Sequence, residues 1–179
     1  MLIETKRLKI RYFEESDSLD LYDYLSDEEV VRYEPYGTYT LEEAREEAKR
    51  RTDDPDFLAV ALESGKVIGN LYFSKRDFEA YELGYVFSQK VWGNGYATES
   101  CEALIKYAFE NLNVHRIIAT CNPRNENSWR LLERLNFRRE GTLIQNIYFS
   151  TDEKGNPIWQ DTYLYGLLKE EWQNRIEIK

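Results

Sequence analysis

The sequence is poor in the residues that build metal centres, disulfide frameworks and membrane spans. Two of its 179 residues are cysteines, Cys101 and Cys121, and one is a histidine, His115. So few thiols and imidazoles disfavour both a disulfide framework and a zinc site. The longest apolar run, residues 57–62, is much shorter than the roughly 20 residues that cross a bilayer. We therefore expect a cytoplasmic protein that holds no metal and has no membrane as a partner.

Positive charge is also scarce, because 24 Lys and Arg face 33 Asp and Glu, for a net charge of -9. Nucleic acid is disfavoured as a partner, since phosphate binding needs clustered Lys and Arg. Residues 13–31 hold eight acids without Lys or Arg, whereas residues 116–139 hold six arginines and two acids. This asymmetry is typical of a protein that takes a cationic acceptor at one mouth of its binding site and a polyanionic cofactor at the other. Ordinary solvated helix faces explain it equally well.

The pattern of elements predicts one domain, residues 1–179, with an α+β fold. Strands and helices follow one another as in a mixed, mostly antiparallel central sheet with flanking helices. The strands at 81–88 and 115–120 should splay apart and form a cofactor cleft. Strands are expected at 7–13, 57–63, 66–74, 81–88, 115–120, 137–149 and 158–168, and helices at 17–25, 26–31, 40–51, 99–112 and 128–135.

A glycine-containing turn joins the strand that ends near Phe87 to the helix that follows. It reads Trp92-Gly93-Asn94-Gly95-Tyr96-Ala97-Thr98. Two glycines one residue apart permit a tight turn with free N–H groups, and the helix dipole behind them attracts an anion. The turn therefore predicts a diphosphate site, with a plain tight turn as the alternative. A dinucleotide fingerprint is disfavoured because Thr98 replaces its third glycine.

The same turn carries a resemblance to a known family. Trp92 to Glu99 resembles the acyl-CoA-binding loop of the GNAT superfamily, Gln/Arg-x-x-Gly-x-Gly/Ala, with Lys90 at the Gln/Arg position. Residues 4–11 and 113–137 extend the resemblance over nearly the whole chain, which is most similar to the RimJ/RimL-type branch. The resemblance implies the acyl-CoA N-acyltransferase fold and an acetyl-CoA-dependent N-acetyltransferase. The acceptor would be a primary amine of a protein N-terminus or a small molecule, and a homodimer is common in this branch.

Candidate site residues follow from the strand, the turn and the resemblance. Backbone N–H groups at the end of the Tyr85-Val86-Phe87 strand can polarise the thioester carbonyl. Asn122 and Asn127 resemble the family's amides for the pantetheine arm. Arg130 and Arg134, one turn apart on the following helix, could reach the cofactor's phosphates, and simple exposure is the alternative. The predicted cofactor-binding residues are thus Val86, Phe87, Gly93, Asn94, Gly95, Tyr96, Ala97, Thr98, Asn122, Asn127 and Arg130.

Two residues are candidates for proton transfer. Glu82, in a context similar to the family's, is the candidate base, and a solvated strand carboxylate is its alternative. Ser128 lies where this branch places a hydroxyl near the sulfur, so it is the candidate acid, and a helix-start serine is the alternative. Tyr33, Tyr36 and Tyr85 are the predicted acceptor-binding residues.

Two other functions remain open at the level of sequence. A CoA-binding regulatory module without transfer activity would carry the same loop. A nucleotide-dependent oxidoreductase is disfavoured by the missing third glycine. Cys121 lacks a histidine or carboxylate partner in sequence, so we expect it to pack near the cofactor and not to act as a nucleophile. The identity of the acceptor amine is not encoded in a recognisable motif.

Overall fold

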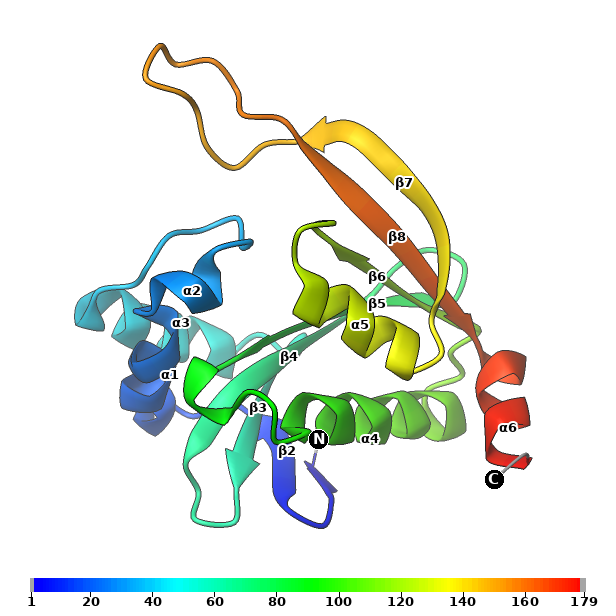
Figure 1. Ribbon diagram of the computed structural model, residues 1–179. Helices are drawn as coiled ribbons and strands as arrows, with labels where there is room; N and C mark the ends of the chain where they lie inside the picture. Colours follow the sequence, from blue (N-terminus) through cyan, green and yellow to red (C-terminus); the bar gives the residue numbers. More distant parts are fainter. Residues whose placement is uncertain (1, 178–179) are drawn as a thin grey trace.

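The computed structural model describes residues 2–177, and its framework is an eight-stranded sheet (Figure 1). The strand order is β1-β2-β3-β4-β5-β6-β8-β7, and only β5 and β6 run parallel. The predicted α+β class is therefore confirmed. The strands are β1 Leu2–Glu4, β2 Leu8–Tyr12, β3 Phe57–Leu62, β4 Val67–Lys75, β5 Ala80–Phe87, β6 Arg116–Cys121, β7 Arg138–Ile147 and β8 Gln160–Leu168.

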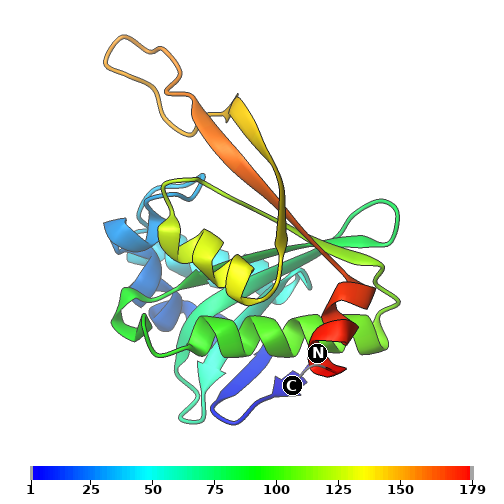
Figure 2. The same cartoon turned by 45° about the vertical axis from the view of Figure 1, so that its right-hand side comes forward.

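Helices cover both faces of this sheet (Figure 2). One face packs against α1 Ser18–Leu25, α2 Glu28–Val31 and α3 Leu41–Thr52, and the other against α4 Tyr96–Asn111, α5 Glu126–Arg134 and α6 Lys169–Glu177. Side chains alternate along β3 between two separate cores. Leu58 and Val60 pack into the core on the α4–α6 side, and Ala59 and Ala61 pack into the core on the α1–α3 side. Two short 3-10 turns, η1 Glu15–Asp17 and η2 Gln89–Val91, complete the elements. None of the described helices has the length and apolarity to cross a membrane.

The predicted divergence of two strands is present between β5 and β6. Their parallel pairing covers three steps and ends at Glu82 opposite Ile118. Beyond that point β5 stays paired with β4 as far as Phe87, and β6 stays paired with β8 as far as Cys121. Each strand therefore keeps one partner and turns the other edge toward an opening in the sheet.

Several element boundaries differ from those expected. The helix predicted from residue 99 begins at Tyr96, because Gly95 at its N-cap is left-handed and lets the chain enter the helix at once. A short strand, β1, was not expected. The final pair is shorter than predicted: β7 ends at Ile147 and β8 begins at Gln160, and register shifts interrupt their ladder. Residues 148–159 therefore form a long projecting arm in place of a short turn (Figure 1).

Local signals for helix ends were reliable. Thr40 and Glu43 have the spacing of a capping box and form one at the start of α3. Asn136, a residue type that often follows a helix, adopts the left-handed conformation after α5. Asn125 caps α5 by accepting a hydrogen bond from the N–H of Ser128 at 3.2 Å. Cys101 on α4 is fully buried in the core.

Candidate active site

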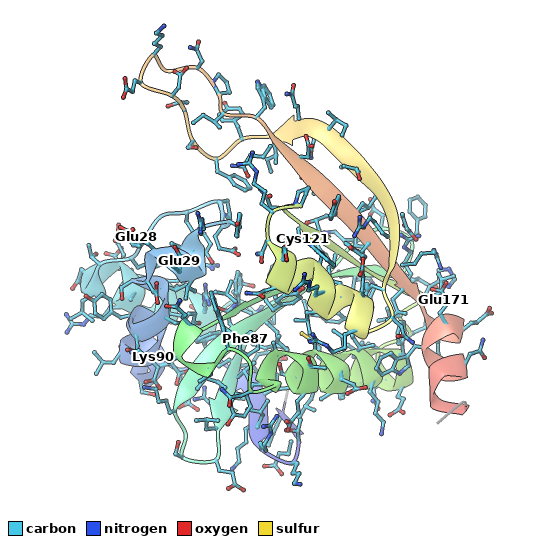
Figure 3. The ribbon with its side chains drawn as sticks, viewed as in Figure 1. Glu28, Glu29, Phe87, Lys90, Cys121 and Glu171 are labelled. Atoms are coloured by element: carbon cyan, nitrogen blue, oxygen red, sulfur yellow. The ribbon has the colours of Figure 1, made fainter. Side chains whose placement is uncertain are left out.

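A cleft of about 1740 Å³ opens where β5 and β6 diverge. Its walls come from α2 and the segment after it, from β5, from the turn before α4 and from the β6–α5 connection. Figure 3 labels Phe87 near the end of β5 and Cys121 at the end of β6, with Glu28 and Glu29 on α2. Almost every predicted site residue lines this one cleft. The exception is Asn94, whose side chain turns back to the carbonyls of Val91 and Trp92.

The turn before α4 has the conformation that its glycines predicted. Gly93 and Gly95 have φ angles of 77° and 80°, which other residues rarely adopt. The first helical hydrogen bond runs from the N–H of Glu99 to the carbonyl of Gly95 at 3.0 Å. The amides of Tyr96, Ala97 and Thr98 therefore precede the first helical acceptor, at the positive end of a helix of 16 residues. This donor set fits a diphosphate group.

An ion pair that the sequence did not suggest braces this turn from the N-terminal strands. Arg7 donates to Glu99 through Nε at 2.7 Å and to the carbonyl of Asn94 through Nη1 at 3.0 Å, and its guanidinium lies 4.4 Å from the ring centre of Tyr96. The other Glu99 oxygen accepts from the Thr5 hydroxyl at 2.6 Å. Burial works against ionisation, but the Thr5 and Arg7 hydrogen bonds outweigh it and lower the pKa of Glu99. Arg7 thus links the turn, through the carbonyl of Asn94, to the first turn of α4, through Glu99.

Lys90, at the position where the family pattern has Gln or Arg, does not face the turn. Its ammonium forms an ion pair with Asp23 on α1. The same carboxylate pairs with Lys66 at 3.4 Å. Lys90 therefore links the start of the turn to the α1–α3 face.

The open edge of β5 presents specific main-chain groups. The N–H of Ser88 donates to the carbonyl of Ile68 on β4 at 2.9 Å. Because successive N–H groups point to opposite edges of a strand, the amide of Val86 also faces β4, whereas those of Tyr85 and Phe87 face the opening. The carbonyl of Phe87 faces the same way and accepts from the Trp92 indole at 2.9 Å. Val86 lines the cleft as predicted, but its amide belongs to the ladder with β4, so the amide of Phe87 is the one that faces the opening at the end of this strand.

Three polar side chains meet across the opening. The Tyr85 hydroxyl lies 2.9 Å from the Ser128 carbonyl and 3.0 Å from the Ser128 hydroxyl. Burial raises the pKa of Tyr85 well above its ordinary value, so the phenol keeps its proton. Burial also raises the pKa of Cys121 to about 11, against a smaller opposite effect of its hydrogen bond with Ser128. Cys121 is thus a thiol at neutral pH, which agrees with the expectation that it is not a nucleophile.

The two predicted amides and Arg130 lie along the β6–α5 side of the cleft. Asn122 donates to Gln160 at the start of β8 at 2.6 Å and accepts from the N–H of Arg124 at 2.9 Å, so its amide is held by β8 and by its own loop. Asn127 lines the cleft beside it. Arg130 is exposed and pairs with Glu126 one turn earlier at 2.9 Å. Among the residues that the structure describes, no three His, Cys, Asp or Glu side chains gather as a metal site would require.

The candidate base Glu82 lines the cleft at the last residue of β5 that pairs with β6. It forms a close ion pair with Arg76, at 2.6 Å from Nη2 and 3.0 Å from Nε. The same guanidinium donates to the Tyr72 hydroxyl at 3.0 Å. Any role of Glu82 in proton transfer would have to compete with this cation.

The predicted acceptor tyrosines lie on the opposite wall. The Tyr33 hydroxyl donates to the carbonyl of Arg124 at 3.2 Å, so the segment after α2 reaches the β6–α5 connection. Tyr36 lines the cleft and packs edge-to-face on Tyr39, with ring centres 5.5 Å apart. Between the two predicted tyrosines lies Glu34, another lining residue, which no sequence pattern marks as part of a site.

Comparisons with known proteins agree with this arrangement. Residues 7–138 match the model of the acetyltransferase (GNAT) domain, so the chain belongs to the GNAT acetyltransferase family. It is 39% identical to the uncharacterized N-acetyltransferase YnaD of Bacillus subtilis, over 96% of this chain and 99% of that protein. A GNAT-family acetyltransferase from Bacillus anthracis has the same fold, with a TM-score of 0.88 and 36% identity over 96% of this chain and 100% of that chain.

A third relative bears on the predicted branch. The chain is 33% identical to the [ribosomal protein uS5]-alanine N-acetyltransferase of Escherichia coli, over 67% of this chain and 55% of that protein. The resemblance to the RimJ/RimL-type branch is therefore confirmed. Together the family and the relatives identify the chain as an N-acetyltransferase with the GNAT acyltransferase fold.

Proposed function

We propose that the protein transfers an acetyl group from acetyl-CoA to a primary amine by direct attack in a ternary complex. The observation that carries this proposal is the alignment of the turn before α4 with the opening between β5 and β6. Free amides at the turn suit a diphosphate. Free amides on the edge of β5 suit a carbonyl that becomes more negative as it reacts.

Acetyl-CoA would supply a thioester that is already reactive, so the protein needs mainly to position and polarise it. The amides of Gly93 to Thr98 hold the diphosphate, and Arg130 adds positive charge nearby. Asn122 and Asn127 border the path of the pantetheine arm. The amide of Phe87, which faces the opening, polarises the carbonyl.

The leaving thiolate needs a proton from a nearby group. Tyr85 and Ser128 share a hydrogen bond at 3.0 Å inside the opening. Since the phenol stays protonated, Tyr85 can donate its proton to the thiolate, either directly or through the Ser128 hydroxyl. The acceptor amine is that of a protein N-terminus or a small molecule, and it enters past Tyr33 and Tyr36.

A thiol-release assay tests the proposal. Acetyl-CoA is offered with peptides that begin with different residues and with small amines that include spermidine, and the product is identified by mass. Calorimetry with CoA alone is run in parallel. Tight CoA binding without turnover on any amine would favour a CoA-binding regulatory module, and absence of CoA binding would refute the cleft assignment itself.

A further inference from the structure

The cleft passes through the sheet and joins its two faces. On β5, Tyr85 and Phe87 pack with the core on the α4–α5 side, while Val86 packs with the core on the α1–α3 side. The turn before α4 is on the first side. The second side holds Glu34, Tyr36, Phe57, Asn70 and Tyr72, all of which line the same cleft. An acceptor that meets the reacting carbonyl from the side opposite the turn must pass these residues.

The carboxylates on the acceptor side differ in how they are neutralised. Three have arginine partners: Glu29 with Arg32 at 3.3 Å, Asp54 with Arg50 at 2.7 Å, and Glu82 with Arg76 at 2.6 Å. Glu34 and Asp56 also line the cleft, and neither forms an ion pair with a cation in the described part of the chain. These two are the carboxylates that remain available to a cationic ligand.

Glu34 is the better placed of the two. Its neighbour Tyr33 is hydrogen-bonded to Arg124 on the β6–α5 connection, which brings this segment to the mouth of the opening. Tyr36, two residues later, packs with the core that contains Val86 of the open strand. Asp56 precedes β3, two strands away from β5. Glu34 therefore lies on a segment held against both sides of the opening.

We propose that Glu34, together with Tyr36, binds the ammonium group of the acceptor and takes its proton. This inference rests on the proposed acetyl transfer and adds the group that receives the amine. It assigns the acceptor a cationic amino group that enters from the α1–α3 face.

The surroundings of Glu34 suit this role. Burial raises the pKa of Glu34 to about 7, and a hydrogen bond with Tyr36 and the charge of Arg51 on α3 oppose that rise. Arg51 is itself neutralised by Glu47 at 2.7 Å. Burial raises the pKa of Tyr36 far above its ordinary value, so this phenol remains a hydrogen-bond donor. A carboxyl that titrates near neutrality is the most effective kind of base for an amine.

The proton balance can be followed through the transfer. Glu34 takes one proton from the ammonium group, and the lone pair so exposed forms the N–C bond to the acetyl carbon. The C–S bond breaks, and its electron pair leaves with sulfur as a thiolate. The thiolate takes one proton, supplied from the Tyr85–Ser128 side, and the nitrogen loses a second proton that replaces it. Glu34 then returns its proton to solvent.

The test compares Glu34→Gln with Glu28→Gln, a matched change of an exposed carboxylate on α2 that does not line the cleft. Acceptors are spermidine and a short peptide with an N-terminal alanine, and kcat/KM for each is measured between about pH 5.5 and pH 9. Wild-type kcat/KM should rise with pH around the pKa of Glu34. In Glu34→Gln it should fall about 100-fold, the size typical of a lost general base. In Glu34→Gln, kcat/KM should rise with pH only as the acceptor amine itself loses its proton. The KM for acetyl-CoA should not change.

Each outcome separates the inference from the function on which it rests. Glu28→Gln should behave as wild type in every measurement. If the wild type acetylates an acceptor and Glu34→Gln does so with the same rate and pH profile, the role of Glu34 is refuted and acetyl transfer still stands. Tyr36→Phe, with the carboxylate retained, should raise the acceptor KM more than it lowers kcat. A wild-type protein that binds CoA but acetylates neither acceptor would refute both.

Discussion

Replacing Glu34 with glutamine is expected to stabilise the fold above neutral pH. The pKa of Glu34 rises from 4.5 to about 7 because the side chain is buried. Below about pH 4.5 the carboxyl is protonated in both the folded and the unfolded state and has no effect on stability. Between about pH 4.5 and about pH 7 the Glu34 carboxyl is ionised in the unfolded state and still protonated in the folded state. The free energy of unfolding that Glu34 contributes therefore falls as the pH rises through this range. At about 1.36 kcal/mol per pKa unit the full loss is at most about 3 kcal/mol, and neutral glutamine avoids it.

Chemical denaturation of wild type and Glu34→Gln at two pH values measures this effect. The advantage of glutamine in the free energy of unfolding should grow by about 1–2 kcal/mol from about pH 5.5 to about pH 8.5. In thermal melts this corresponds to about 2–8 °C in Tm for a chain of this length. Glu28→Gln, an exposed site, should show no such growth. An advantage that is the same at both pH values would contradict a partly buried carboxyl without an ion-pair partner at position 34.

Three further substitutions test the cofactor side of the cleft. Gly95→Val should lose CoA binding by at least about tenfold in calorimetry, because valine is strained at a φ of 80° and its Cβ would lie 3.6 Å from the Arg7 guanidinium that braces the turn. Gly65→Val, with a φ of 88° in a hairpin turn outside the cleft, should keep CoA binding. Arg7→Met should raise the KM for acetyl-CoA about tenfold with little change in kcat, since it removes the brace on the carbonyl of Asn94; an unchanged KM would show that the turn holds its shape alone. Tyr85→Phe should lower kcat by about 100-fold without loss of CoA binding, and full activity would exclude the phenol as the proton source.

The parts of the fold that could be predicted from sequence are those set by local chemistry. Gly93 and Gly95 between a strand and a helix predicted a tight turn with free amides, and the structure has a tight turn there, with both glycines in the left-handed region. Thr40 and Asn136 predicted helix ends for reasons confined to a few neighbouring residues. The projecting arm was missed because β7 and β8 lose register between Leu143 and Ile147. Nothing in the alternation of either strand alone reports that loss of pairing.

The site residues that were missed depend on contacts between distant parts of the chain. Arg7 matters because it meets Glu99, 92 residues later, and no local pattern joins the two. Glu34 looks like any acid near a helix end. Its pKa rises only because packing of the segment after α2 at the mouth of the cleft buries the carboxyl, and this effect outweighs the opposing charge of Arg51 on α3. Glu82 shows the reverse, since its place on β5 was foreseen but its partner Arg76 was not. A carboxylate's position on a strand follows from pattern, whereas its availability as a base depends on which cation the fold brings to it. Glu34 and Glu82 differ in that respect, and this difference favours Glu34 as the group that receives the amine.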